Sequence, residues 1–173
     1  MANLTIDTSD QRDMTMLEKP KACKTIDEMT VGERCAVRYV ISDDDLKKFA
    51  EVSDDWNPLH FDEDYASRSR YKRRIAHGMI SVAKFSGIFG MHMPGVGTVW
   101  EAQEVRFLAP VYLNVYYTAI AEVMSLERKR AKLRTWVEDE EGNRVIEGVA
   151  WVVPISAIAR RRLNGQLAGK ETD

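Results

Sequence analysis

The chain has 173 residues, of which 45% are hydrophobic and 30% charged, as is typical of one globular domain large enough to bury a core. Its 25 basic and 27 acidic residues leave a formal net charge of -2, which gives no electrostatic case for nucleic acid as a partner. No window approaches the roughly 18 uncharged apolar residues of a membrane span, and the N-terminus has no signal-peptide pattern. Cys23 and Cys35 lack partners at metal-binding spacing, so we expect reduced thiols in a cytoplasmic protein.

The first third of the chain predicts an extension, a strand and a helix. Residues 1–26 show no sustained period, and we expect a mobile extension or a surface arm there. Alternation over residues 35–41 predicts a strand. Ser42 then caps a helix that runs to about Ser53. Three aspartates follow Ser42 in the first helical turn, where the helix dipole favours negative charge.

Residues 54–60 are predicted to form a loop with fixed bends. Pro58 has no N–H group, and it biases Asn57 away from helical backbone angles. Asp55 and His60 flank this pair, so the loop carries both an acid and a base. Residues 62–68 could add one or two helical turns.

A run of basic residues follows and allows two interpretations. It could be a solvated surface loop, or it could contact a phosphate or an acidic carrier protein beside a binding site. The five residues are Arg68, Arg70, Lys72, Arg73 and Arg74.

The segment from Gly78 to about Phe89 predicts a helix at the centre of the fold. Apolar side chains fall on nearly every face of this segment, which is typical of a buried helix. The free N–H groups at its start, near Gly78, would attract negative charge. Gly90 and a Met-Pro-Gly turn end it.

The remainder predicts an antiparallel meander. We expect strands over residues 98–108, 111–124, 130–139 and 145–153, followed by a polar tail over 155–173. A curved antiparallel sheet wrapped around one apolar helix satisfies this order of elements. Because one sheet covers only one side of the helix, full burial would need a second sheet and therefore a dimer.

Several candidate residues also have plainer interpretations. An isolated Asp-x-Asn-Pro is often an Asx turn, and Asp54 competes with Asp55 as the acid. His77 is expected to orient the loop, and His92 to lie in a surface turn. A metal site built from Asp55, His60 and His77 is conceivable, but the spacing matches no known zinc pattern.

Five motifs lie between residues 55 and 111: Asp55-x-Asn-Pro-x-His60, Tyr65-Ala66, Ile75-Ala76-His77-Gly78-Met79, Ser86 and Val105-Arg106-Phe107-Leu108-Ala109-Pro110-Val111. Through these motifs, residues 28–154 resemble the MaoC-like family of (R)-specific enoyl-CoA hydratases and 3-hydroxyacyl-thioester dehydratases. The resemblance implies an α+β hot-dog fold over residues 27–154, in which an antiparallel sheet wraps a long central helix, and a dimer as the minimal unit.

The resemblance also implies roles for particular residues. Asp55 and His60 would be the catalytic pair, Asn57 would shape the loop, and Ser86 would support the pair, although Ser86 could instead bond a carbonyl one turn earlier. The Gly78 N–H would bind the thioester oxygen. Which of Asp55 and His60 is the base stays open. One departure is Tyr112-Leu113-Asn114, where many members have a Gly-Asp turn.

The expected function is therefore the reversible hydration of a trans-2-enoyl thioester to the (R)-3-hydroxyacyl thioester, without a cofactor. The thioester carrier would be CoA or acyl carrier protein. The alternatives are a hot-dog thioesterase and a non-catalytic subunit that binds acyl thioesters. A homodimer or larger homo-oligomer is expected, with no membrane or nucleic-acid partner.

Overall fold

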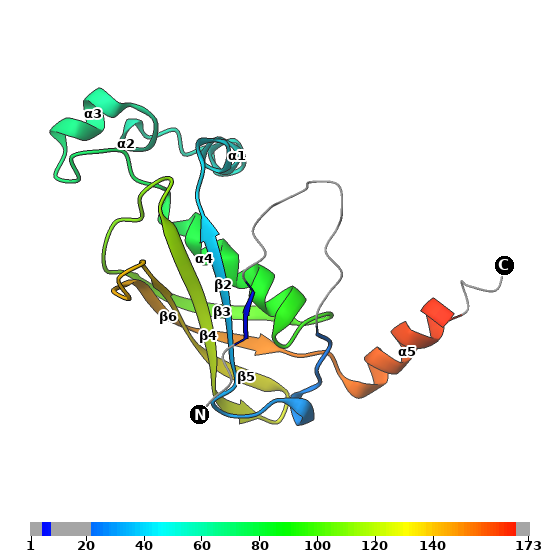
Figure 1. Ribbon diagram of the computed structural model, residues 1–173. Coiled ribbons are helices and arrows are strands. Elements are labelled where there is room, and N and C mark those ends of the chain that lie inside the picture. Colours follow the sequence, from blue (N-terminus) through cyan, green and yellow to red (C-terminus); the bar gives the residue numbers. More distant parts are fainter. Residues whose placement is uncertain (1–4, 8–21, 169–173) are drawn as a thin grey trace.

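A computed structural model describes residues 5–7 and 22–168, which form one curved sheet with a helix across its face (Figure 1). The strand order in the sheet is β1-β2-β4-β5-β6-β3, and every pair is antiparallel except β1 with β2. The strands are β1 (Thr5–Asp7), β2 (Arg34–Val40), β3 (Val99–Phe107), β4 (Tyr116–Glu127), β5 (Arg130–Glu138) and β6 (Arg144–Val153). The helices are η1 (Ile26–Glu28), α1 (Asp43–Ser53), α2 (Pro58–Phe61), α3 (Glu63–Arg68), α4 (Gly78–Gly87), the π-helical turn η2 (Ile88–His92) and α5 (Ala157–Ala168).

The core lies between α4 and the sheet, which confirms the predicted arrangement. Phe85, Ile88 and Phe89 are almost fully buried and share one apolar cluster with Val123 and Leu133 of the central strands. Val123 is paired with Leu133, so side chains of neighbouring strands reach the same face in register. This cluster fixes α4 on the sheet and thereby fixes the position of the helix start.

The side of α4 that faces away from the sheet is not covered by the described part of the chain. Met79, Ala83, Ser86 and Gly87 are exposed, and the predicted burial on every face would need the second sheet of a dimer. Their spacing of three to four residues places them on one stripe of the helix. A single sheet covers only one side of a helix, so none of the residues that the structure describes covers this stripe.

Both predicted terminal segments contain regular structure in their described parts. Residues 5–7 of the predicted extension form a strand beside β2, and residues 1–4 and 8–21 lie outside the described residues. The predicted polar tail contains α5, which is joined to the body where Arg160 Nη1 lies 2.5 Å from Glu28 Oε2. No helix in the described ranges is long and apolar enough to cross a membrane.

α1 follows the prediction closely and delivers the chain to the candidate loop. The Ser42 hydroxyl accepts a hydrogen bond from the Asp45 N–H at 3.2 Å, and the Asp45 carboxylate accepts one from the Ser42 N–H at 3.0 Å. This reciprocal pair satisfies two N–H groups of the first turn. Asp54 ends α1 in a left-handed conformation with φ 58°, which turns the chain into Asp55.

The predicted strand over residues 111–124 begins only at Tyr116. Residues 111–114 instead hold the segment that precedes α4: the Val111 carbonyl accepts from the Ala76 N–H at 2.7 Å, and Tyr112 forms a β-bridge with Ile75. Asn114 has φ 57°, and its N–H donates to the Ile41 carbonyl. These backbone contacts fix residues 75–77 beside the candidate loop.

Candidate active site

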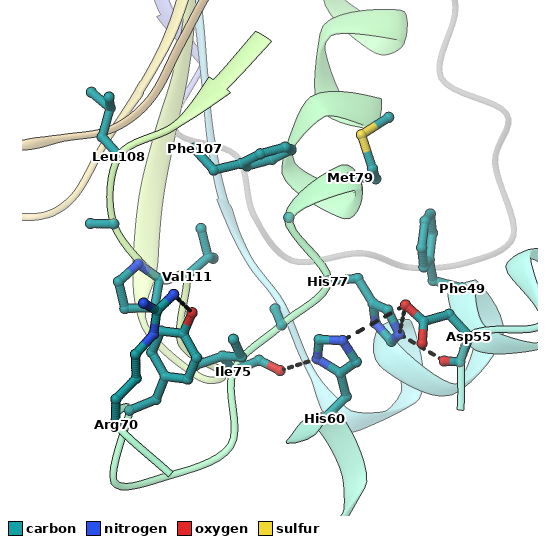
Figure 2. Close-up of a pocket in the computed structure, with 15 residues that line it drawn as sticks. Phe49, Asp55, His60, Arg70, Ile75, His77, Met79, Phe107, Leu108 and Val111 are labelled. Carbon is teal, nitrogen blue, oxygen red and sulfur yellow. Dashed lines mark hydrogen bonds and ion pairs between the residues drawn. The ribbon is translucent and has the colours of Figure 1, made fainter. Parts of the chain in front are cut away.

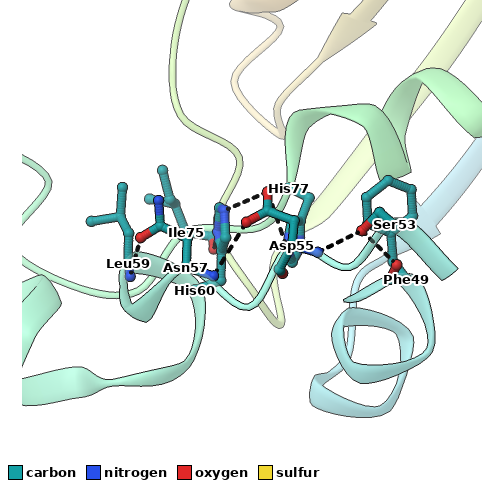
Figure 3. Close-up of polar contacts among 8 residues, drawn as sticks. All are labelled: Phe49, Ser53, Asp55, Asn57, Leu59, His60, Ile75 and His77. Atoms are coloured by element: carbon teal, nitrogen blue, oxygen red, sulfur yellow. Dashed lines mark hydrogen bonds and ion pairs between the residues drawn. The ribbon is translucent and has the colours of Figure 1, made fainter. Parts of the chain in front are cut away.

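The Asp55 loop is shaped by short-range hydrogen bonds from its own side chains (Figure 3). The Asp55 carboxylate accepts from the Asn57 N–H at 3.2 Å, and the Asn57 side chain accepts from the Leu59 N–H at 3.0 Å. Asn57 thereby caps α2, whose first residue is Pro58. The predicted loop ends earlier than residue 60, because proline is well accommodated in a first helical turn, where its missing N–H would have had no partner.

His60 projects from α2 into a buried position, where it is 8% exposed. Its Nδ1 lies 2.8 Å from the Ile75 carbonyl, which can only accept, so Nδ1 carries the proton. The neutral ring therefore presents the lone pair of Nε2. This atom lies 3.8 Å from the Asp55 carboxylate, which is too long for a direct hydrogen bond.

His77 packs against His60 and is tied to the loop. The two rings are stacked with centroids 3.7 Å apart, and His77 is 4% exposed. Its Nε2 donates to the Asp55 backbone carbonyl at 2.9 Å and lies 3.7 Å from the Asp55 carboxylate (Figure 3). These contacts hold Asp55 in place, as expected of an orienting residue.

Burial lowers the pKa of His60 below its ordinary value of 6.5, and the neighbouring His77 ring adds to this effect. The Ile75 carbonyl and the Asp55 carboxylate act in the opposite direction but do not outweigh burial. His60 is thus neutral at neutral pH, with an unprotonated Nε2. The Asp55 side chain, in contrast, is 49% exposed.

The same three side chains gather as a metal site would, with one donor atom from each within 4.8 Å of the others. However, His77 Nε2 donates to a carbonyl and so has no lone pair to offer a metal. Asp55 and His60 alone are too few ligands for a tetrahedral site. The arrangement suits proton transfer better than metal binding.

The group opens into a cavity of about 550 Å³ (Figure 2). Asp55, His60 and His77 line one part of it, and the start of α4 lines another. Most of the remaining wall is apolar: Phe49, Ile75, Met79, Phe107, Leu108, Pro110 and Val111 contribute to it. An apolar cavity with a few polar groups at one place is typical of a small-molecule site.

Gly78 is the first residue of α4 and lines the cavity. His77, the N-cap residue of this helix, makes no side-chain cap hydrogen bond. The first N–H groups of the helix therefore remain available to bind a ligand. A Cβ at this position would lie 2.5 Å from the Phe107 ring. Glycine is therefore needed for the close approach of this ring as well as for access to the backbone.

The structure brings together Asp55, His60 and Gly78, as predicted. Asn57 lies beside them in the loop but does not line the cavity. Ser86 is exposed two turns along α4 and is also absent from the cavity wall, so its supporting role stays a prediction. Phe49 of α1 also lines the cavity, and no motif in the sequence marks it as a site residue.

Comparison with known proteins identifies a matching family and several relatives of the chain. Residues 22–146 match the model of the MaoC-like domain. The chain is 37% identical over 129 residues to an (R)-specific enoyl-CoA hydratase of Rhodospirillum rubrum, covering 73% of this chain and 89% of that protein. It is 35% identical over 111 residues to a mitochondrial 3-hydroxyacyl-[acyl-carrier-protein] dehydratase of Arabidopsis thaliana, with 64% of each chain covered.

The fold is shared as well. The solved (R)-hydratase from Aeromonas caviae, described as involved in PHA biosynthesis, superimposes with a TM-score of 0.72 at 32% identity, covering 74% of this chain and 98% of that one. The antiparallel sheet with its long helix is therefore the predicted hot-dog fold. The family predicted from the motifs is confirmed: this chain belongs to the MaoC-like domain family.

Proposed function

We propose that this protein catalyses the reversible hydration of a trans-2-enoyl-CoA to the (R)-3-hydroxyacyl-CoA. The observation that carries the proposal is the pairing of Asp55 with the lone pair of His60 Nε2, 3.8 Å apart, at one end of an apolar cavity. Relatives named as enoyl-CoA hydratases support the reaction and the choice of CoA.

The gap between Asp55 and His60 Nε2 suits a bridging water, which would hydrogen-bond to both groups. His60 Nε2 takes one proton from this water as the oxygen attacks C3 of the substrate. The imidazolium formed in this way then returns a proton to C2. Asp55 orients the water and stabilises the positive charge on the ring, and the enzyme ends with the protons it started with.

Attack at C3 moves negative charge onto the thioester carbonyl oxygen. The Gly78 N–H, at the positive end of the α4 dipole, would stabilise that oxygen as the charge develops. The apolar wall around Phe107 and Val111 keeps bulk water away from the acyl group.

The open stripe of α4 and the edge position of β3 support a homodimer as the functional unit. Among the described strands, β3 has only β6 as a neighbour, and Val99, Phe107 and Leu108 at or beside it are exposed. An unpaired strand edge next to an apolar surface is a favourable place for a second copy to bind. Small residues on α4 would allow the two copies to approach closely.

The function is tested by the hydration of crotonyl-CoA, followed by the loss of enoyl-thioester absorbance. We expect turnover to the (R)-3-hydroxy product, and a loss of activity of about 10²–10⁴-fold in both Asp55→Asn and His60→Gln, because each removes one of the groups that handle the water proton. Asp54→Asn is the matched control, since the Asp54 side chain does not line the cavity. Release of free CoA in place of hydration would contradict the proposal and indicate a thioesterase.

The rate should depend on pH in a way that follows from the lowered pKa of His60. A lowered pKa keeps the ring neutral to lower pH, so kcat/KM should stay high below pH 6.5 and fall only as pH drops through the lowered pKa. His92→Gln should show the same profile, because His92 lies in η2 outside the cavity. A fall centred at or above pH 6.5 would count against His60 as the base.

Gly78→Ala should reduce activity by about tenfold or more, because the added methyl and the Phe107 ring cannot both keep their positions and the N–H would be displaced. The double variant Gly78→Ala/Phe107→Leu should recover part of this loss, since the smaller side chain leaves room for the methyl group. Steady-state kinetics of the single and double variants measure the effect. Additive losses would show that the Phe107 contact is not the cause.

The dimer is tested with Gly87→Arg. A Cβ at Gly87 meets no atom of the described residues within 4 Å, and arginine favours helix more than glycine does, so the protomer should remain folded. We expect sedimentation to show a dimer for the wild type and a monomer for this variant. Ser67→Arg, an exposed position on α3, is the control and should stay dimeric. A wild-type monomer would refute the dimer.

A further inference from the structure

The positive charges of residues 68–74 are locally concentrated. This stretch contains five basic residues and no acidic one, in a chain whose total charge is only -2. The stretch lies between α3 and the segment that precedes α4, so it is part of the same connection that carries His77. Such a concentration of charge attracts anions when it is not neutralised by the protein itself.

Two of the five residues, Arg73 and Arg74, contact residues of other parts of the fold. Arg74 pairs with Asp43 at 2.7 Å and with Glu63 at 3.3 Å. The Arg73 guanidinium lies 3.7 Å from the centroid of the Tyr112 ring. These two residues therefore anchor the basic stretch to α1, α3 and the segment before β4.

The other three, Arg68, Arg70 and Lys72, pair with no carboxylate in the part of the chain that the structure describes. All three are exposed. Arg70 donates a hydrogen bond to the Tyr71 hydroxyl and stacks over its ring, 4.7 Å from the centroid. The guanidinium is thus held in place with most of its N–H groups still free.

Arg70 and Tyr71 line the same cavity as Asp55 and His60. In Figure 2, Arg70 lies at the other end of the wall from Asp55, with Ile75 and His60 between them. Because Arg70 is exposed, this end of the cavity meets solvent. The cavity therefore has the acid and base at one end and an unpaired cation at the other.

We propose that Arg70 and Lys72 form a phosphate subsite at this mouth of the cavity, which binds the phosphate groups of the pantetheine-linked carrier of the thioester. This inference rests on the proposed function for the nature of the ligand. Guanidinium groups bind phosphate oxygens through paired, charge-assisted hydrogen bonds, and a nearby ammonium adds a point charge. Arg68 contributes to the same positive field.

The subsite is tested by calorimetric binding of butyryl-CoA and of butyryl-pantetheine, which lacks phosphate. Neither ligand has a double bond to hydrate, so binding is measured independently of the proposed reaction. We expect Arg70→Gln/Lys72→Gln to weaken butyryl-CoA binding by about tenfold or more and to leave butyryl-pantetheine unchanged. The wild-type affinity for butyryl-CoA, but not for butyryl-pantetheine, should fall as salt is raised.

The matched control is Lys129→Gln/Arg161→Gln, which removes the same two charges at exposed positions in the β4–β5 turn and on α5. It should bind both ligands as the wild type does. Butyryl-phosphopantetheine separates the sources of phosphate. A defect with this ligand as well as with CoA supports contact with the phosphate that CoA and carrier proteins share. A defect with CoA alone supports contact with its nucleotide phosphates.

Equal weakening of both butyryl ligands in the double variant would overturn the proposal, because it would indicate a distorted loop and no phosphate contact. Unchanged affinity for both ligands in the double variant would also overturn the proposal. Failure of the wild type to bind either ligand would overturn it as well. Phosphate-dependent binding without hydration of crotonyl-CoA would leave the subsite standing and refute the proposed reaction. The two proposals therefore fail in different measurements.

Discussion

The packing of α4 on the concave face of the sheet is the constraint on which the rest of this structure depends. Phe85, Ile88 and Phe89 fill the space against the central strands, so the helix cannot slide or rotate without opening cavities in the core. Its first residue, Gly78, is thereby fixed at the wall of the candidate site. Among the described residues, the same packing leaves the other side of the helix uncovered, which is where a second copy is proposed to bind.

The chemistry of the site follows from how two backbone carbonyls hold two histidines. The Ile75 carbonyl sets the tautomer of His60, and the Asp55 carbonyl sets that of His77. His60 consequently presents a lone pair toward Asp55, whereas His77 presents an N–H that donates to the Asp55 carbonyl and holds the loop in position. Residues of identical chemistry thus receive different roles from their hydrogen bonds alone.

Charge is distributed along the cavity in a way that matches a thioester with a phosphate-bearing carrier. One end contains the Asp55 carboxylate beside the stacked rings of His60 and His77. The open end carries cations whose neighbours, Arg73 and Arg74, are already bound to the protein. Arg73 and Arg74 hold the segment in place, and the cations without a carboxylate partner among the described residues are left to meet the ligand.

The sequence alone determined the family, the order of elements and the candidate pair. One short span with specific motif spacing contains Asp55, His60 and Gly78. Local signals, such as the cap at Ser42 and the apolar run after Gly78, can be recognised from the sequence. Only the tertiary structure decided the histidine tautomers, the contact between Gly78 and Phe107, the bare stripe of α4, and which of the five basic residues remain unpaired. These features depend on groups far apart in the chain, such as Arg74 with Asp43 or Ala76 with Val111. Sequence spacing describes neighbours along the chain, whereas pairing and burial are properties of neighbours in space.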